Sequence, residues 1–266
     1  MKTPLRYPGG KSRAVKHVLP YIPEGVERVC SPFFGGGSIE LALASRGIQV
    51  FGYDKMKQLV WFWQGLCGDN NKLADEVEKL REQYLIRNGE TVTGCSKESF
   101  HQYREDLKIE TFMFSYERAA KYYAINRASF SGATFSGGWS EKASYARFTE
   151  SSVKRLRDFN AYNFRVDYAN FEDSISWHPK AFLYLDPPYM LKGSQNSLYG
   201  VDGNLHDSFD HEKLHSLLMN RGDWVMSYND CKEIREMYKD CEIHEAKWAY
   251  GMNKSKKSSE IIIIGR

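Results

Sequence analysis

The fold class of this 266-residue chain is decided by the stretch Val26-Glu27-Arg28-Val29-Cys30-Ser31-Pro32-Phe33-Phe34-Gly35-Gly36-Gly37-Ser38. Its first six residues predict a strand, the glycine run predicts a loop, and the apolar pattern from Ser38 to Ala44 predicts a helix. Strand, glycine loop and helix in this order open a doubly wound α/β fold that binds a nucleotide. The glycines let a ligand approach the backbone, and the helix N-terminus supplies a partial positive charge.

A second predicted strand, Gln49-Val50-Phe51-Gly52-Tyr53, carries Asp54 at its carboxyl end, seventeen residues after Gly37. An acid at this position hydrogen-bonds the hydroxyl groups of a ribose in the general scheme of such folds. The glycine loop alone is also compatible with an ordinary turn. Together with Asp54, it predicts a ligand that contains a nucleoside.

The tetrapeptide Asp186-Pro187-Pro188-Tyr189 follows the apolar run Ala181-Phe182-Leu183-Tyr184-Leu185 without a spacer. The run predicts a buried strand, and ligands of open α/β sheets bind at the carboxyl ends of the strands. Proline has no N–H group, so the two prolines leave backbone carbonyls available as acceptors. A carboxylate, free carbonyls and an aromatic ring suit an amino group on a flat ring. A plain strand-ending turn explains the tetrapeptide alone equally well.

Further strands are predicted at 163–167, 224–228, 242–250 and 260–264, and the last two form an antiparallel pair. Residues 56–160 interrupt this pattern, with helices predicted through Trp61 and Leu66, and over Leu73 to Leu85, Tyr116 to Phe130 and Ser151 to Phe159. About a hundred residues are too many for a connection, so they predict a mainly helical domain inserted into an α/β domain of residues 1–55 and 161–266. A helical lid that only packs on the sheet is the alternative.

The net charge of +3 decides little, but the charges are unevenly distributed along the chain. Residues 1–23 contain five lysines and arginines and no acid, residues 69–117 contain eleven acids and seven bases, and residues 118–165 contain nine bases and three acids. This segregation indicates a basic face with a polyanionic partner. Solvated helix faces also explain charge runs, and on charge alone they are the favoured explanation.

Several classes of protein are disfavoured by the composition. Five cysteines without a Cys-x-x-Cys pair argue against a disulfide framework and a zinc site. His211 and His215 share one face of a predicted helix, but no third ligand accompanies them, so no metal site is predicted. No stretch approaches the roughly 18 apolar residues of a membrane span, and the N-terminus lacks an apolar signal segment. A cytoplasmic protein without a membrane partner is therefore expected.

Four sequence features resemble, in their order, the Dam-type or alpha-group DNA adenine N6-methyltransferases: Tyr7-Pro8-Gly9-Gly10-Lys11, Pro32-Phe33-Phe34-Gly35-Gly36-Gly37-Ser38, Asp54 and Asp186-Pro187-Pro188-Tyr189. The resemblance covers the chain from residue 4 to its last strand. It implies a Rossmann-like, mostly parallel, seven-stranded methyltransferase sheet with a C-terminal antiparallel pair, and makes residues 56–160 the target-recognition domain. The Phe-Asn-x-Pro-Phe-Gly stretch of GATC-specific members is absent, so no recognition sequence is predicted.

The resemblance also implies that S-adenosylmethionine lies over the glycine loop and becomes S-adenosylhomocysteine, without a metal. The expected cofactor-binding residues are Tyr7, Lys11, Pro32, Phe33, Gly35, Gly37, Ser38, Asp54, Asn170, Phe171 and Asp186. Catalysis on a flipped adenine is expected from Asp186, Pro187, Pro188 and Tyr189. The expected DNA contacts are Arg6, Asn126, Arg127, Ser131, Lys142, Arg147, Lys254, Lys256 and Lys257.

The chemistry of the tetrapeptide fits this reaction. Asp186 and the Pro187 carbonyl can accept the two hydrogens of the adenine N6 group, which points its lone pair at the sulfonium methyl. Tyr189 stacks on the base, and the polar segment 190–208 is placed to close over it. We expect a monomeric, site-specific adenine methyltransferase acting on double-stranded DNA, with a cognate restriction endonuclease as a candidate partner. Methylation of RNA adenine or protein glutamine, and a non-catalytic DNA-binding regulator of the same fold, are the alternatives.

Overall fold

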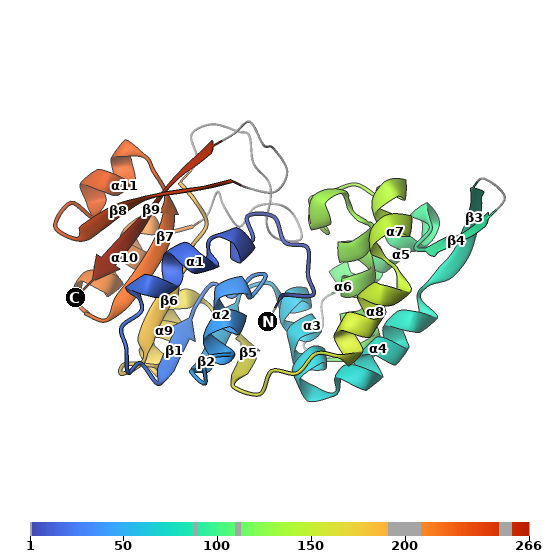
Figure 1. Cartoon of the computed structure of the whole chain (residues 1–266), viewed down its shortest axis with the longest axis horizontal. Coiled ribbons are helices and arrows are strands. Elements are labelled where there is room, and N and C mark those ends of the chain that lie inside the picture. Colours follow the sequence, from blue (N-terminus) through green and yellow to red (C-terminus); the bar gives the residue numbers. More distant parts are fainter. Residues whose placement is uncertain (1, 88–89, 110–112, 191–208, 250–256, 266) are drawn as a thin grey trace.

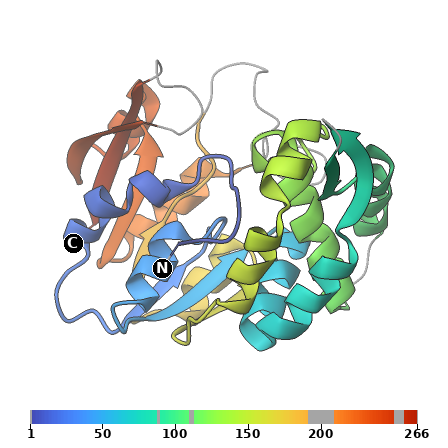
Figure 2. The same cartoon turned by 45° about the vertical axis from the view of Figure 1, so that its right-hand side comes forward.

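A computed structural model describes residues 2–87, 90–109, 113–190, 209–249 and 257–265 of the chain. Figure 1 shows a sheet with its covering helices on the left and a group of inserted helices on the right, ending in a hairpin at the far edge. Figure 2 shows the N-terminal segment, in blue, running between these two parts. The N-terminal segment is therefore placed to contact both of them.

The sheet has seven strands in the order β5-β2-β1-β6-β7-β9-β8. The first five in this order run parallel, and β9 pairs antiparallel with both β7 and β8. The predicted fold class, a mostly parallel seven-stranded sheet with a C-terminal antiparallel pair, is confirmed. The bounds of its strands are β1 Arg28–Ser31, β2 Gln49–Asp54, β5 Phe164–Tyr168, β6 Phe182–Leu185, β7 Trp224–Asn229, β8 Glu242–Ala249 and β9 Lys257–Gly265.

The strand order reverses between β1 and β6, which lie side by side although β2, β5 and the whole insertion separate them in sequence. Their parallel register pairs Val29 with Phe182 and Cys30 with Leu183. The glycine loop after β1 and the tetrapeptide after β6 therefore leave the sheet at the same edge. Doubly wound folds bind their ligands in the crevice at such a point of reversal.

Helices cover both faces of the sheet, because successive side chains of a strand point to opposite faces. On β6, Phe182 and Tyr184 join one apolar cluster, and Leu183 and Leu185 join the other. The first face is covered by α1 Val15–Val18 and α2 Ser38–Ala44, with short 3-10 helices at Lys11–Arg13 and Leu19–Tyr21 beside α1 (Figure 1). The second face is covered by α9 Phe171–Trp177, α10 His211–Met219 and α11 Lys232–Met237.

The described part of the insertion is mainly helical. The predicted helix from Leu73 to Leu85 is wrong in its second half, because the helix ends at Lys79 and the chain then enters an antiparallel hairpin. The β-branched residues Thr91-Val92-Thr93 favour a strand there. The turn predicted at Asn88-Gly89 lies outside the described residues. The elements are α3 Lys57–Gly68, α4 Asn70–Lys79, β3 Glu82–Arg87, β4 Glu90–Gly94, α5 Lys97–Lys108, α6 Tyr116–Ala128, the 3-10 helix Phe130–Gly132, α7 Glu141–Arg147 and α8 Glu150–Arg157.

Helix α3 joins the insertion to the sheet through a shared apolar core. The Phe62 ring stacks on Tyr123 of α6 at a centroid distance of 5.5 Å, and the next residue, Trp63, meets Phe164 of β5 edge-on at 5.9 Å. One apolar cluster therefore runs from the sheet through α3 into the inserted helices. Within the described parts of the chain, no helix is both long and apolar enough to span a membrane.

Candidate active site

The glycine loop between β1 and α2 forms a tight turn. Phe34 N–H donates to Tyr53 O at 2.8 Å, and Gly37 N–H donates to Phe34 O at 2.9 Å. Trp63 of α3 donates its indole N–H to Gly35 O at 3.0 Å. Gly37 has a φ of +67°, and a Cβ atom there would lie 2.7 Å from the Phe34 ring. Glycine is therefore required at this corner for both its conformation and its size.

Asp54 at the end of β2 fastens the glycine loop. Its Oδ2 accepts the Gly35 N–H at 3.0 Å, and its Oδ1 accepts the Met56 N–H at 2.9 Å. Burial raises the pKa of Asp54 above its usual value. Each carboxylate oxygen has a second lone pair. Asp54 can therefore hold the loop and also accept hydrogen bonds from the hydroxyl groups of a ribose.

Tyr7 lies across the outside of the glycine loop. A turn closed by Gly10 N–H donating to Tyr7 O at 3.0 Å bends the chain beside it. A Cβ atom on Gly36 would lie 2.8 Å from Tyr7 Cβ, and one on Gly35 would lie 3.0 Å from the Tyr7 ring. The absence of glycine side chains thus lets Tyr7 approach the backbone, and the N-terminal segment packs on the glycine loop.

Three phenylalanines gather beside the loop. The Phe33 ring lies 5.8 Å from Phe171 and 5.6 Å from Phe209, measured between ring centroids. Phe209, which precedes α10, is not singled out by any sequence pattern. Asn170 is exposed, and its Oδ1 caps α9 by accepting the Asp173 N–H at 2.7 Å. The cap uses the Asn170 amide oxygen, so the side-chain group that stays available to a ligand beside the phenylalanines is the amide nitrogen, a donor.

The remaining expected cofactor residues divide between the loop and the tetrapeptide. Pro32 is buried after β1, and Ser38 begins α2 with its Oγ 3.1 Å from Ser12 Oγ. Lys11 lies with the tetrapeptide, where its Nζ contacts Asp186. The ammonium group is therefore held at the tetrapeptide.

Asp186 directly follows the carboxyl end of β6. Lys11 Nζ lies 2.8 Å from Asp186 Oδ1, and Ser227 Oγ donates to the same oxygen at 3.1 Å. Lys11 also donates to Tyr189 OH at 2.6 Å. The Asp186 side chain is 23% exposed, whereas that of Lys11 is 5% exposed. The carboxylate can thus be reached by a ligand, while the ammonium is enclosed by protein.

The tetrapeptide is supported from behind by β7. Tyr228 OH donates to Pro188 O at 3.2 Å and contacts His211 Nδ1. The Tyr189 ring stacks on Tyr228 with centroids 5.7 Å apart and an angle of 23° between the planes. Burial raises the pKa of Tyr228 far above its usual value, so the hydroxyl group stays a neutral donor. Pro187 is buried. These contacts fix the direction of the tetrapeptide backbone and of the Tyr189 ring.

Two buried glutamates lie near Asp186 and are not found by reasoning from the sequence. Glu40 of α2 is 2% exposed and accepts the Ser31 hydroxyl at 2.7 Å, and burial raises its pKa to about 8. Glu260 of β9 is also 2% exposed, and burial raises its pKa to about 7. The signal in the sequence for Glu260 is an acid placed directly before the apolar run Ile261–Ile264.

The glycine loop, Asp54 and the tetrapeptide thus lie at the same edge of the sheet, and a comparison with known families identifies the chain. Residues 7–252 match the D12 class N6 adenine-specific DNA methyltransferases. The chain belongs to this family. It is also similar to the modification methylase StsI of Streptococcus sanguinis, with 23% identity over 301 residues. That alignment covers 99% of this chain but 42% of the relative, so the chain spans less than half of that protein.

Two of the side chains that were predicted from the sequence to contact DNA are buried. Asn126 is 0% and Arg127 is 4% exposed. The Asn126 side chain bonds the backbone of Arg6, and Arg127 donates to Arg147 O at 2.8 Å and to Pro4 O at 3.4 Å. The expectation for these two side chains is therefore corrected: their polar atoms hold the N-terminal segment against α6 and do not face a partner.

The other residues that were predicted to contact DNA lie at the surface where the structure describes them. Lys142 and Arg147 are exposed on α7, and Arg6 and Ser131 are partly exposed. Burial and the charges of Arg127 and Arg147 lower the pKa of Arg6 to about 10, which shows that like charges gather here. Within the described residues, no acid forms an ion pair with Arg6, Lys142 or Arg147. Outside the described residues lie Lys254, Lys256, the side chain of Lys257 and nearly all of the segment 190–208.

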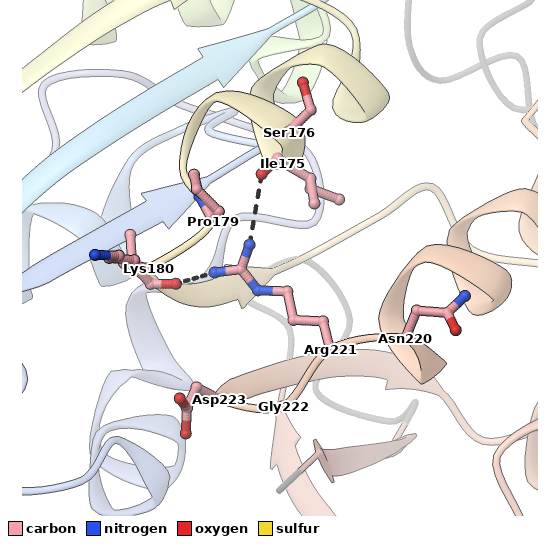
Figure 3. Close-up of a pocket in the computed structure, with 9 residues that line it drawn as sticks. Ile175, Ser176, Pro179, Lys180, Asn220, Arg221, Gly222 and Asp223 are labelled. Atoms are coloured by element: carbon pink, nitrogen blue, oxygen red, sulfur yellow. Dashed lines mark hydrogen bonds between the residues drawn. The ribbon is translucent and has the colours of Figure 1, made fainter.

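A hollow lies at the opposite edge of the sheet, where β6 and β7 begin (Figure 3). Arg221 extends across it and donates to Ile175 O at 3.4 Å and to Ala181 O. The arginine thus ties the end of α9 to the start of β6. Since Asp186 follows the other end of β6, the hollow is separate from the candidate active site.

Proposed function

We propose that this chain transfers the methyl group of S-adenosylmethionine to the N6 atom of a flipped adenine in double-stranded DNA. The observation that carries the proposal is the position of Asp186. Its accessible carboxylate stands at the end of β6, beside the glycine loop that follows β1. Membership of the D12 family supports the same reaction.

The residues at this edge of the sheet fit S-adenosylmethionine. Gly35 and Gly37 adopt positive φ and keep side chains out of the loop, and the Asp54 carboxylate suits a ribose. The rings of Phe33 and Phe171 suit the face of an adenine. When bound, the cofactor supplies a methyl group on a positively charged sulfur, which keeps the bonding electron pair when the methyl group leaves.

Asp186 and the Pro187 carbonyl are the proposed acceptors for the two hydrogens of the target amino group. These hydrogen bonds localise the lone pair on N6 and direct it at the methyl carbon. As N6 bonds the methyl carbon, it becomes positively charged and then loses one proton, which Asp186 can receive and pass to water. Tyr189, held by Tyr228, supplies the face on which the base lies.

The inserted helices are proposed to recognise the DNA. Lys142 and Arg147 of α7, with Arg6 beside them, offer positive charge to phosphates. Phe130 is 68% exposed next to Ser131, whose φ is +59°, and an exposed apolar ring in a basic surface suits contact with unstacked bases. A monomeric state, a cytoplasmic location and a cognate restriction endonuclease stay predictions.

The test is incubation of the purified protein and methyl-labelled S-adenosylmethionine with adenine-containing duplex DNA, and separately with RNA and with protein extract. We expect label in the DNA, recovered as N6-methyladenine. Asp186→Asn keeps the shape but removes the charge, and should lower the rate at least about 100-fold.

Asp158→Asn, in the exposed pair of α8 with Lys154, is the matched control and should retain full activity. Label that enters only RNA or protein would contradict the proposal. So would an Asp186→Asn variant as fast as the wild type.

A further inference from the structure

Glu260 is a buried carboxyl group at the same edge of the sheet as Asp186, where it lies opposite Asn229 of β7. It is 2% exposed, and by distance and angle neither of its carboxyl oxygens makes a hydrogen bond within the described part of the chain, although the nearby Tyr189 hydroxyl group lowers its pKa. Leaving such a group unsatisfied destabilises the folded protein. An unsatisfied buried group at an active site indicates a partner that arrives in another state of the site.

Lys11 is the cation that faces Glu260. Its Nζ is 3.9 Å from Glu260 Oε2, which is too far for a hydrogen bond, but 2.8 Å from Asp186 Oδ1 and 2.6 Å from Tyr189 OH. The same Nζ lies 4.9 Å from the centroid of the Tyr189 ring. The ammonium group therefore contacts both side chains that the target adenine is proposed to use. Asp186 is the proposed acceptor for its amino group, and Tyr189 is the proposed surface for its ring face.

We propose that Glu260 is a positioning residue that draws the Lys11 ammonium away from Asp186 and Tyr189 when the target adenine enters. This inference rests on the proposed methyl transfer to adenine. A movement of Nζ by about 1 Å converts the 3.9 Å separation from Glu260 into a charge-assisted hydrogen bond. Asp186 Oδ1 is then free to accept a hydrogen of N6.

An ammonium group that stays on Asp186 opposes methyl transfer for two reasons. It donates its own hydrogens to the carboxylate, which becomes a weaker acceptor for the amino group. It also repels the positive charge that develops on N6, and like charges interact strongly in an enclosed site. Pairing with Glu260 compensates the charge of Lys11 and removes both effects.

Glu260 must be ionised to hold Lys11. The groups that face its carboxyl are Lys11 beside α1, Asp186 and Tyr189 after β6, and Tyr184 of β6. Burial raises the pKa of Glu260 to about 7, although Lys11 acts in the opposite direction. The carboxyl group is thus mainly protonated near pH 6 and mainly ionised near pH 8, and methyl transfer should accelerate between them.

The test is the pH dependence of the single-turnover rate of methyl transfer to duplex DNA. The wild-type rate should rise about 10-fold between pH 6 and pH 8, as one carboxyl group ionises. Glu260→Gln should lose this rise and be about 10-fold slower at pH 8, with an unchanged Kd for S-adenosylmethionine, and Glu260→Asp should restore part of it.

Glu76→Gln removes a carboxyl group on the inserted helix α4, where its partner is Lys79, and should keep the wild-type pH profile. This variant is the matched control. A Glu260→Gln variant with the rate and pH profile of the wild type would overturn the proposal.

A titration separates this inference from the proposed function. Carbon-13 NMR of glutamate-labelled protein should show Glu260 titrating near pH 7, and at higher pH in Lys11→Met, with the signal assigned by its loss in Glu260→Gln. A titration near 4.5 that Lys11→Met leaves unchanged would overturn the pairing, even where DNA is methylated. A wild type that methylates no DNA would overturn the proposed function, and the expected titration would still support the pairing.

Discussion

Asn126 exchanges two hydrogen bonds with the backbone of Arg6. Its Oδ1 accepts the Arg6 N–H at 3.1 Å, and its Nδ2 donates to Arg6 O at 2.7 Å. Nδ2 also donates to Gly132 O at 3.0 Å, in the turn that follows α6. Because Tyr7 is the next residue, one buried amide connects the inserted helices to the wall of the proposed cofactor site.

Asn126→Ala should weaken cofactor binding from a distance. The substitution leaves the buried Arg6 backbone groups unsatisfied, and we expect a loss of about 2–4 kcal/mol in the free energy of unfolding. Because Tyr7 is then no longer held in place, the Kd for S-adenosylmethionine should rise about 10-fold. Calorimetry can measure this change. Asn220→Ala, at an exposed position after α10, should change neither. An unchanged Kd would show that the N-terminal segment is held without Asn126.

Gly37→Ala should abolish cofactor binding, whereas Gly47→Ala should not. Both glycines have positive φ, +67° and +88°, but a Cβ on Gly37 meets the Phe34 ring at 2.7 Å and one on Gly47 meets nothing within 4 Å. Both variants carry about 1 kcal/mol of backbone strain, and Gly37→Ala adds steric overlap of about 1–3 kcal/mol. Thermal unfolding and cofactor titration check the difference. Equal effects of the two variants would mean that strain alone matters.

Tyr228→Phe should slow methyl transfer by up to about 10-fold without unfolding the protein, because it removes one hydrogen bond to Pro188 O. Tyr238→Phe is the matched control. Tyr238 is equally buried at 1% exposure, but packs against His215 and Trp224, away from the tetrapeptide. Single-turnover rates measure both. A Tyr228→Phe variant as fast as Tyr238→Phe would show that the hydroxyl group does not orient the tetrapeptide.

Glu40→Gln should stabilise the protein at alkaline pH. Burial raises the pKa of Glu40 from 4.5 to about 8. Between these two pH values the folded chain keeps a proton that the unfolded chain releases. The stability of the fold therefore decreases as the pH rises from about 4.5 to about 8. The variant should exceed the wild type by about 1–3 kcal/mol at pH 8.5 and match it near pH 4.5, by urea unfolding. The same difference at both pH values would rule out ionisation as the cause.

Lys142→Ala and Arg147→Ala should each weaken DNA binding by a similar factor for every sequence. Each exposed base neutralises about one phosphate, so each variant should lower the slope of log K against log salt concentration by about 1. Lys79→Ala, on the exposed face of α4 where Lys79 pairs with Glu76, should leave the slope unchanged. An unaltered slope in both α7 variants would place the DNA on another surface.

The sequence predicts the sheet well and the insertion only in part. Apolar runs and glycine punctuation locate the seven strands, because strand burial is a local pattern. The prediction that the helix reaches Leu85 is wrong. The charged helical pattern continues past the end of the helix, into residues that pair as a hairpin with Thr91-Val92-Thr93. That pairing is a contact between separate segments, which a local pattern does not show. Helices α5 and α7 fall where the sequence reasoning assigned no helix.

The sequence by itself determined the order of the motifs, the fold class and the edge of the sheet at which Asp54 and Asp186 emerge. The tertiary structure alone decided which polar groups meet there. Lys11 pairs with Asp186 beside the unsatisfied Glu260, while Asn126 turns inward to hold the N-terminal segment. The physical reason is the distance along the chain over which the interactions act. The hydrophobic periodicity of neighbouring residues is enough to determine a helix or strand and its buried face. The burial of one polar side chain depends on partners more than a hundred positions away.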